Sequence, residues 1–205
     1  MKTNIRLRSY KLIAGSISLG LLVALILPST TDALTGTTTI SSTIGSAINI
    51  FTTSGTVNLN AIPTGAGVQT SSSDTITVST NNSAGYTLSL NETAASTALV
   101  SGGNSIPAIS GSTFATPVAL TANTWGYRVD GIGGFGAGPT TSISNAAIGA
   151  VKYAPVPATA SPQTLKTTGT TATNDVTTVW YSVAVNTATP SGTYTNSVTY
   201  TAVTN

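Results

Sequence analysis

Residues that could do chemistry are scarce in this chain of 205 residues. It contains 7 Lys and Arg, 5 Asp and Glu, no His and no Cys. Zinc sites of the usual kinds, cysteine nucleophiles, disulfides and Ser-His-Asp triads need His or Cys, so the sequence excludes them. Carboxylate chemistry, main-chain recognition and apolar contact remain. We therefore expect a protein without enzymatic activity and without a cofactor or metal.

Asp130 belongs to the most site-like cluster, beside Arg128, Trp125 and Tyr127. With a second carboxylate it could act in glycoside hydrolysis, since two such acids need only be close in space. The alternation instead favours a strand in which Trp125, Tyr127 and Val129 face the core while Arg128 and Asp130 lie on the solvent-exposed face. A secreted hydrolase that uses Asp130 remains the least favoured alternative.

Residues 131–136 match the G-x-G-x-x-G pattern of dinucleotide-binding loops. That function requires a strand before the loop and a helix after it. Pro139 and the Ser/Thr-rich residues that follow do not predict a helix. We therefore predict a flexible loop, in which Phe135 either packs onto the sheet or is presented to a partner.

Two lysines raise a further possibility, an internal Lys–Asn isopeptide bond that requires a buried acid nearby. Lys152, next to Tyr153, is the better candidate, and Lys166 is the other. The sequence leaves open whether such a bond forms. Calcium binding is not expected, because the aspartates are too scattered to form a ligand loop.

Residues 1–33 have the pattern of a signal peptide. Four basic residues precede the uncharged, apolar run 12–27, and small residues at Thr31 and Ala33 predict cleavage after Ala33. The alternative is a retained anchor, although the run is shorter than the roughly 20 residues of a spanning helix. Residues 34–205 then carry three basic and four acidic residues, a net charge of −1. This balance argues against nucleic-acid binding, and the signal peptide predicts an extracellular location.

Alternating apolar and hydroxyl residues predict that 34–205 is a single all-β domain, an antiparallel β-sandwich of Greek-key or Ig/pilin-like type. One hairpin is predicted from residues 74–80 and 86–90, with a turn at 81–85. A second is predicted from 178–185 and 193–202. Further short strands are expected at 56–61, 124–129 and 150–153.

Residues 34–50 place every large apolar side chain at an even position, namely Leu34, Ile40, Ile44, Ile48 and Ile50. One interpretation is one or two strands of the protein's own sheet. The other is a donor strand that completes a neighbour's sheet by β-strand addition. We keep these five residues as candidate partner contacts.

Three aromatic residues are further candidate partner contacts: Trp125, Phe135 and Trp180. Trp180 points away from the face formed by Val179, Tyr181 and Val183, so it lies either under a loop or in a binding patch. Exposed aromatic rings could stack on sugars. A carbohydrate- or cell-wall-binding module is therefore an alternative function.

The closing residues 190–201, PSGTYTNSVTYT, resemble the last hairpin of secreted bacterial β-sandwich surface proteins. WxL-domain proteins and spore-coat-U-type, pilin-like proteins share a similar P-x-G-x-Y-x-x-x-V pattern. Residues 78–88 and 123–127 look like surface proteins with the same layout. The WxL resemblance implies peptidoglycan binding, and the coat-type resemblance implies chaperone–usher assembly.

Taken together, these patterns predict a secreted structural or adhesive protein of a bacterial cell surface. Its expected partners are cell-wall polymer, a host surface or like subunits, with membrane contact only through an uncleaved N-terminal segment. Few charges leave strand edges unprotected, and unprotected edges invite strand addition.

Overall fold

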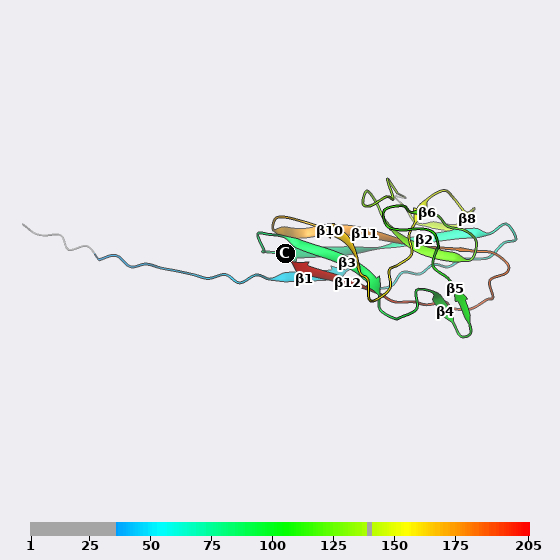
Figure 1. Ribbon diagram of the computed structural model, residues 1–205, viewed down its shortest axis with the longest axis horizontal. Helices are drawn as coiled ribbons and strands as arrows, with labels where there is room; N and C mark the ends of the chain where they lie inside the picture. The colour runs from blue at the N-terminus through cyan, green and yellow to red at the C-terminus, as the bar shows by residue number, and fades with distance from the viewer. Residues whose placement is uncertain (1–35, 139–140) are drawn as a thin grey trace, which may run out of the picture. The chain divides into compact units, whose positions relative to one another are not determined.

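The computed structural model describes residues 36–138 and 141–205 (Figure 1). The chain divides between Thr43 and Ile44 into two units, and every strand belongs to Ile44–Asn205. The described residues form strands, turns and loops without a helix, so the all-β prediction is confirmed. They accordingly include no helix long and apolar enough to cross a membrane. The predicted signal peptide, residues 1–33, lies outside them.

The described residues contain twelve strands. In chain order they are β1 (Ile48–Thr52), β2 (Val68–Thr80), β3 (Tyr86–Glu92), β4 (Leu99–Ser101), β5 (Asn104–Ile106), β6 (Val118–Ala119), β7 (Thr124–Val129), β8 (Ile143–Ala146), β9 (Lys152–Tyr153), β10 (Gln163–Thr167), β11 (Ala172–Val185) and β12 (Val198–Thr204).

The larger sheet has five antiparallel strands in the order β1-β2-β11-β7, with β8 pairing to β2 as well. Its centre is the long pair β2 and β11, which runs in register from Val68 opposite Val185 to Thr80 opposite Ala172, with one irregularity near Asp175. β1 pairs with residues 76–80 of β2, and β8 with residues near Gln69 and Ser71. Thr, Val and Ile dominate these strands because their branched side chains suit a pleated surface.

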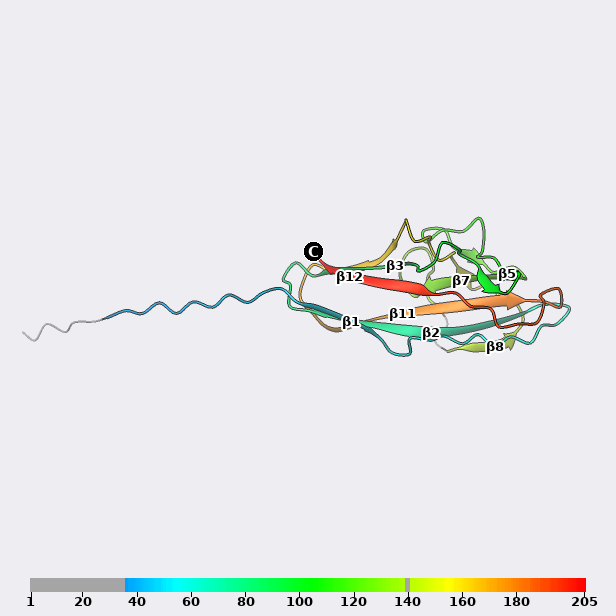
Figure 2. The same ribbon diagram turned by 90° about the horizontal axis from the view of Figure 1, so that it is seen from below.

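The smaller sheet has three antiparallel strands in the order β10-β3-β12. Figure 2 shows β3 and β12 on one side and β1, β2 and β11 on the other. Side chains of both sheets form one core cluster, in which Leu88 and Leu90 of β3 join Ile76 and Val78 of β2 and Val179 of β11. Period-two alternation explains this arrangement, since successive side chains point to opposite faces.

The two predicted hairpins are wrong, although their strands exist. β2 and β3 lie in different sheets, as do β11 and β12. The turn at 81–85 therefore joins two sheets, and Gly85, at φ +83°, is packed so tightly that a Cβ atom would lie 2.4 Å from the Thr168 carbonyl oxygen. Local alternation predicts a strand and its inward face, but a chain reversal between sheets has the same local pattern.

A second apolar cluster covers part of the outer face of the larger sheet. Ile109, Leu120 and Tyr153 pack there against Ala184 of β11, beneath the pair β6–β9. We call this the covered face. It explains why both faces of β11 are buried from Val179 onwards.

The predicted short strands have different outcomes. The strand at 124–129 is confirmed as β7, while only Lys152 and Tyr153 of the segment 150–153 form a strand. Residues 56–61 form none, although Val57, Leu59 and Ala61 still pack against the core. In this segment the alternation reflects the burial of every second side chain, although no described strand pairs with these residues.

Candidate functional site: an exposed segment and two open strand edges

The predicted partner-binding segment 34–50 is partly a strand and partly exposed chain. Ile48 and Ile50 lie in β1 and pack, half-buried, against the core. Ile40 and Ile44 are 92% and 84% exposed, and residues 36–47 form no strand. Leu34 lies outside the described residues. The own-fold interpretation therefore holds for β1, while the isoleucines upstream stay exposed.

Asn81 fixes the point where the chain enters the larger sheet. The Ala47 N–H donates to its Oδ1 at 2.7 Å, and its Nδ2 donates to the Gly45 carbonyl at 2.9 Å. The Thr80 hydroxyl also donates to the Ala47 carbonyl at 2.7 Å. These bonds hold the backbone from Gly45 onwards, next to the turn that links β2 to β3.

β12 presents an unpaired edge. The Thr93 N–H donates to the Ser197 carbonyl at 2.9 Å, and the Asn205 N–H donates to the Gly85 carbonyl at 3.1 Å. Because antiparallel strands alternate in the direction of their N–H and C=O groups, the odd-numbered residues of β12 bond to β3. Val198, Tyr200 and Ala202 therefore direct these groups outward, where no described strand pairs with them.

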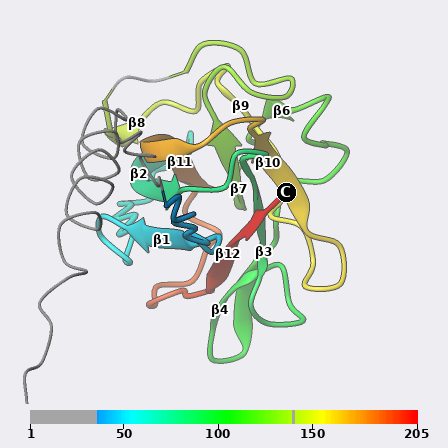
Figure 3. The same cartoon turned by 90° about the vertical axis from the view of Figure 1, so that its left-hand side faces the viewer.

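β1 has a matching edge. The bonds from Asn81 N–H to the Ala47 carbonyl and from Thr53 N–H to the Thr75 carbonyl flank the strand. By the same alternation, the main-chain groups of Ile48 and Ile50 point away from β2. Figure 3 shows β1 beside β12, and the two strands are in contact.

The two edges share a set of half-buried apolar side chains. The same residues that direct main-chain groups outward turn their side chains toward the core. We call this set the apolar row: Ile48, Ile50, Val198, Tyr200 and Ala202. An extended segment beside β12 would find both hydrogen-bonding groups and apolar contacts there.

A pair of tyrosines links the apolar row to the larger sheet. The hydroxyls of Tyr181 in β11 and Tyr200 in β12 share a hydrogen bond. Burial raises the pKa of both phenols above the usual value, and the charge of Asp74 adds to the rise. Asp74 itself accepts hydrogen bonds from the N–H groups of Ser54 and Thr75, at 3.0 and 2.8 Å.

Arg128 corrects the prediction of a solvent-exposed face. Trp125, Tyr127 and Val129 face the core as predicted, but Arg128 is only 1% exposed because it lies on the covered face. Its Nε donates to Asp130 Oδ1 at 2.8 Å. Its other nitrogens donate to three carbonyls, those of Phe135, Gly136 and Lys152.

The glycine-rich segment 131–136 is a compact loop held by Arg128. The Gly131 N–H donates to the Gly136 carbonyl at 3.0 Å, and Gly131, Gly133 and Gly136 all have positive φ, which glycine adopts without strain. Phe135 is 4% exposed and packs edge-on against Phe114 and Tyr127. Of the two outcomes predicted for Phe135, packing onto the sheet is confirmed.

The candidate tryptophans are also buried. Trp125 is 3% exposed and its Nε1 donates to the Thr97 carbonyl, while Trp180 is 6% exposed. Trp180 lies opposite Arg128 in the register of β11 and β7. A partner would reach Trp125, Phe135 or Trp180 only after rearrangement of this chain, because the protein's own loops and sheets cover them.

The two lysines proposed for an isopeptide bond have different surroundings. Lys166 Nζ contacts Asp175 Oδ1, and the Tyr86 hydroxyl donates to Asp175 Oδ2 at 2.8 Å. Burial tends to raise the pKa of Asp175, but the hydrogen bonds from Lys166 and Tyr86 and the lysine's charge hold it below its usual value. Lys152 is exposed on β9. The structure thus shows an ion pair at Lys166, the weaker of the two candidates for an isopeptide bond.

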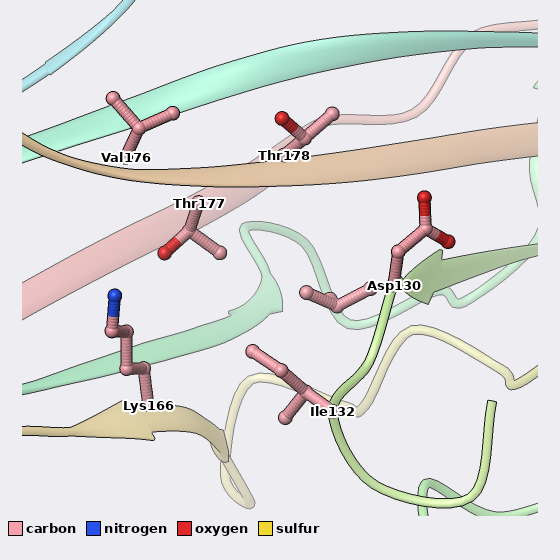
Figure 4. A pocket seen from close by; sticks show the side chains of 7 residues that line it. Asp130, Ile132, Lys166, Val176, Thr177 and Thr178 are labelled. Atoms are coloured by element: carbon pink, nitrogen blue, oxygen red, sulfur yellow. The ribbon is translucent and has the colours of Figure 1, made fainter. Parts of the chain in front are cut away.

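Asp130 and Lys166 line one opening of about 250 Å³ between β10 and the larger sheet (Figure 4). Its other lining residues are Val129, Ile132, Val176, Thr177 and Thr178. None of them is a second acid, so this opening brings no carboxylate pair to Asp130. Among the described residues, no group of three or more acidic side chains could hold a metal ion.

Sequence reasoning did not find which strands form the open edges, nor the hydrogen bonds by which Asn81 holds residues 45–47. The shared face of Val198, Tyr200 and Ala202 was readable from the alternation, but their outward main-chain groups depend on which strand lies beside β12. Comparison with protein-family models, with curated proteins and with solved structures finds no match to this chain.

Proposed function

We propose that this protein is a secreted structural subunit of a bacterial cell surface, wall-associated or pilin-like, that joins copies of itself by β-strand addition. One observation supports the proposal most. An exposed segment with apolar residues at even positions occurs in the same chain as two unpaired edges flanked by a half-buried apolar row. In this proposal the two sheets form a β-sandwich of Greek-key or Ig/pilin-like type.

The exposed segment fits the edge of β12 in length and pattern. Residues 36–44 would span about 30 Å as a strand, enough to cover the seven residues of β12. Ile40 and Ile44 are four positions apart and share one face of such a strand. Added beside β12 of a second copy, that face would lie on the apolar row, and Thr39 and Thr43 would face solvent.

The absence of charge at these surfaces is consistent with assembly. β1 and β12 contain no charged residue, and neither does the segment 36–47. Charged side chains are a common means by which proteins prevent pairing at strand edges. Exposed Thr and Ser side chains keep the segment polar without opposing a neighbouring strand.

The test uses the chain from Leu34 onwards, studied by size-exclusion chromatography with light scattering. We expect the wild-type protein to form concentration-dependent assemblies. The double substitution Ile40→Asp and Ile44→Asp should leave a folded monomer, because it would bury two unpaired carboxylates in the contact. The matched control, Thr39→Asp with Thr43→Asp, adds the same charge on the opposite face and should still assemble.

A second variant tests the acceptor edge. Ala202→Pro removes an N–H that points away from β3, so the smaller sheet should stay intact while strand addition is blocked. The proposal would be refuted if the isoleucine and threonine variants assembled to the same extent. It would also be refuted if the wild-type protein stayed monomeric at all concentrations.

A further inference from the structure

Glu92 is a buried acid with no partner. It is the last residue of β3 and the only glutamate in the chain. Its side chain is on the same face as Leu88 and Leu90 and is 0% exposed, and neither carboxylate oxygen has a hydrogen-bond partner among residues 36–138 and 141–205. Buried polar groups usually have partners, and an exception of this kind asks for an explanation.

The groups that face Glu92 offer no positive charge. The negative charges of Asp74 in β2 and of Glu92 contribute to the raised pKa of Tyr181 in β11. The Tyr200 hydroxyl of β12 is hydrogen-bonded to the Tyr181 hydroxyl. The basic residues of the described chain lie elsewhere. Arg128 pairs with Asp130, Lys166 pairs with Asp175, and Lys152 is exposed on β9.

Burial alone raises the pKa of the Glu92 carboxyl to about 7. The side chain is therefore uncharged in mildly acidic solution and ionised in mildly alkaline solution. An ionised carboxylate without a partner is strongly unfavourable in an apolar core, so the folded protein has to relax when the proton leaves.

The strand most able to relax is β12. Glu92 lies opposite Val198, the first residue of β12, in the smaller sheet. β12 has one neighbouring strand, whereas β3 lies between two. The main-chain groups of Glu92 are bonded as well: its N–H donates to the Pro157 carbonyl, and its own carbonyl accepts from the Thr159 hydroxyl and from Asn91 Nδ2.

We propose that Glu92 is a pH-sensitive switch for the edge strand β12. When the carboxyl is protonated, β12 closes over the core. When it is ionised, the start of β12 loosens so that the carboxylate can reach water. The consequence of this switch for assembly rests on the proposed function, because an ordered β12 is the edge to which a second copy would add.

A direct test follows from the single glutamate. With glutamate labelled by ¹³C at the carboxyl carbon, the folded chain should give one side-chain carboxyl resonance to follow against pH. We expect a midpoint near pH 7, as burial implies. A midpoint near 4.3, the usual value for glutamate, would overturn the proposal.

Amide exchange tests the link to β12. The N–H groups of Thr199 and Thr201 bond to β3, so they report its attachment. If the loosened state has an ordinary glutamate, their protection should fall about tenfold between pH 6 and pH 8 after correction for intrinsic exchange. Val183 in the larger sheet should change much less. Equal changes at all three amides would overturn a local switch.

Two variants separate the switch from general destabilisation and from the proposed function. Glu92→Gln keeps the size but cannot ionise, so the pH dependence at Thr199 should disappear; its persistence would refute the proposal. Lys152→Gln removes one exposed charge, and the pH dependence of exchange at Thr199 should persist in this variant. A switch seen in exchange while the wild type never assembles would leave this inference standing and refute the proposed function.

Discussion

The covered face and the apolar row differ in how a buried ionisable side chain is partnered. On the covered face, the buried guanidinium of Arg128 has a carboxylate and three carbonyls as acceptors. Near the apolar row, the carboxyl of Glu92 is equally buried and has none. The main-chain groups differ in the same way, since Tyr127 of β7 exchanges hydrogen bonds with Ala154, while no described strand pairs with the outer groups of β12.

This difference follows from which face of the molecule its own strands and loops cover. Additional strands and loops cover the outer face of the larger sheet, where Arg128 is bonded to Asp130, although Tyr153 Oη and Trp180 Nε1 have no hydrogen-bond partner among the described residues. On the side formed by β1 and β12, no further strand of the described chain pairs with the two edges. In the proposed function, contact between copies takes place at these main-chain edges, which neither a motif nor a reactive side chain marks in the sequence.

The largest expected effect on stability comes from removing the Arg128 side chain, which hydrogen-bonds to Asp130 and three carbonyls on the covered face. Arg128→Ala would leave Asp130 and three carbonyls without their donor, so we expect a loss of about 3–5 kcal/mol in the free energy of unfolding. Urea unfolding measures it. The control Lys152→Ala changes an exposed lysine and should stay within about 0.5 kcal/mol. A loss below about 1 kcal/mol for Arg128→Ala would break the comparison.

An intermediate effect should appear near the apolar row as pH changes. The pKa of Glu92 is about 7 in the folded state, above the ordinary value of about 4.3 expected on unfolding. The native state thus binds the proton more tightly, and stability falls as pH rises through this window. We expect urea unfolding to give about 2 kcal/mol less stability at pH 8 than at pH 5. Stability that is unchanged or higher at pH 8 would contradict this.

The smallest effect sharpens the picture of β12. Val203 is 52% exposed on the face of β12 that points away from the apolar row. Val203→Thr should therefore change the free energy of unfolding by less than about 0.5 kcal/mol and leave assembly intact. Loss of assembly in this variant would place the contact on the outer face of the smaller sheet and not on the edge.

Sequence reasoning placed elements better than it placed their neighbours. The alternation found β7, and it found the inward faces of β2, β3, β11 and β12. It failed at both predicted hairpins, because a strand, a turn and another strand read the same whether the chain returns in one sheet or crosses to another. It also placed Arg128 in solvent, because residues distant in sequence, such as Tyr153, cover that face.

The amino-acid sequence by itself determined that the chain forms strands, which side chains point inward, and which classes of site are excluded because the chain has no His and no Cys. Those properties depend on residue type and on a period of two along one strand. Tertiary structure alone decided which edges stay open, that Arg128 is partnered and that Glu92 is not. Pairing and burial are properties of neighbours brought together from remote parts of the chain, and no local pattern specifies them.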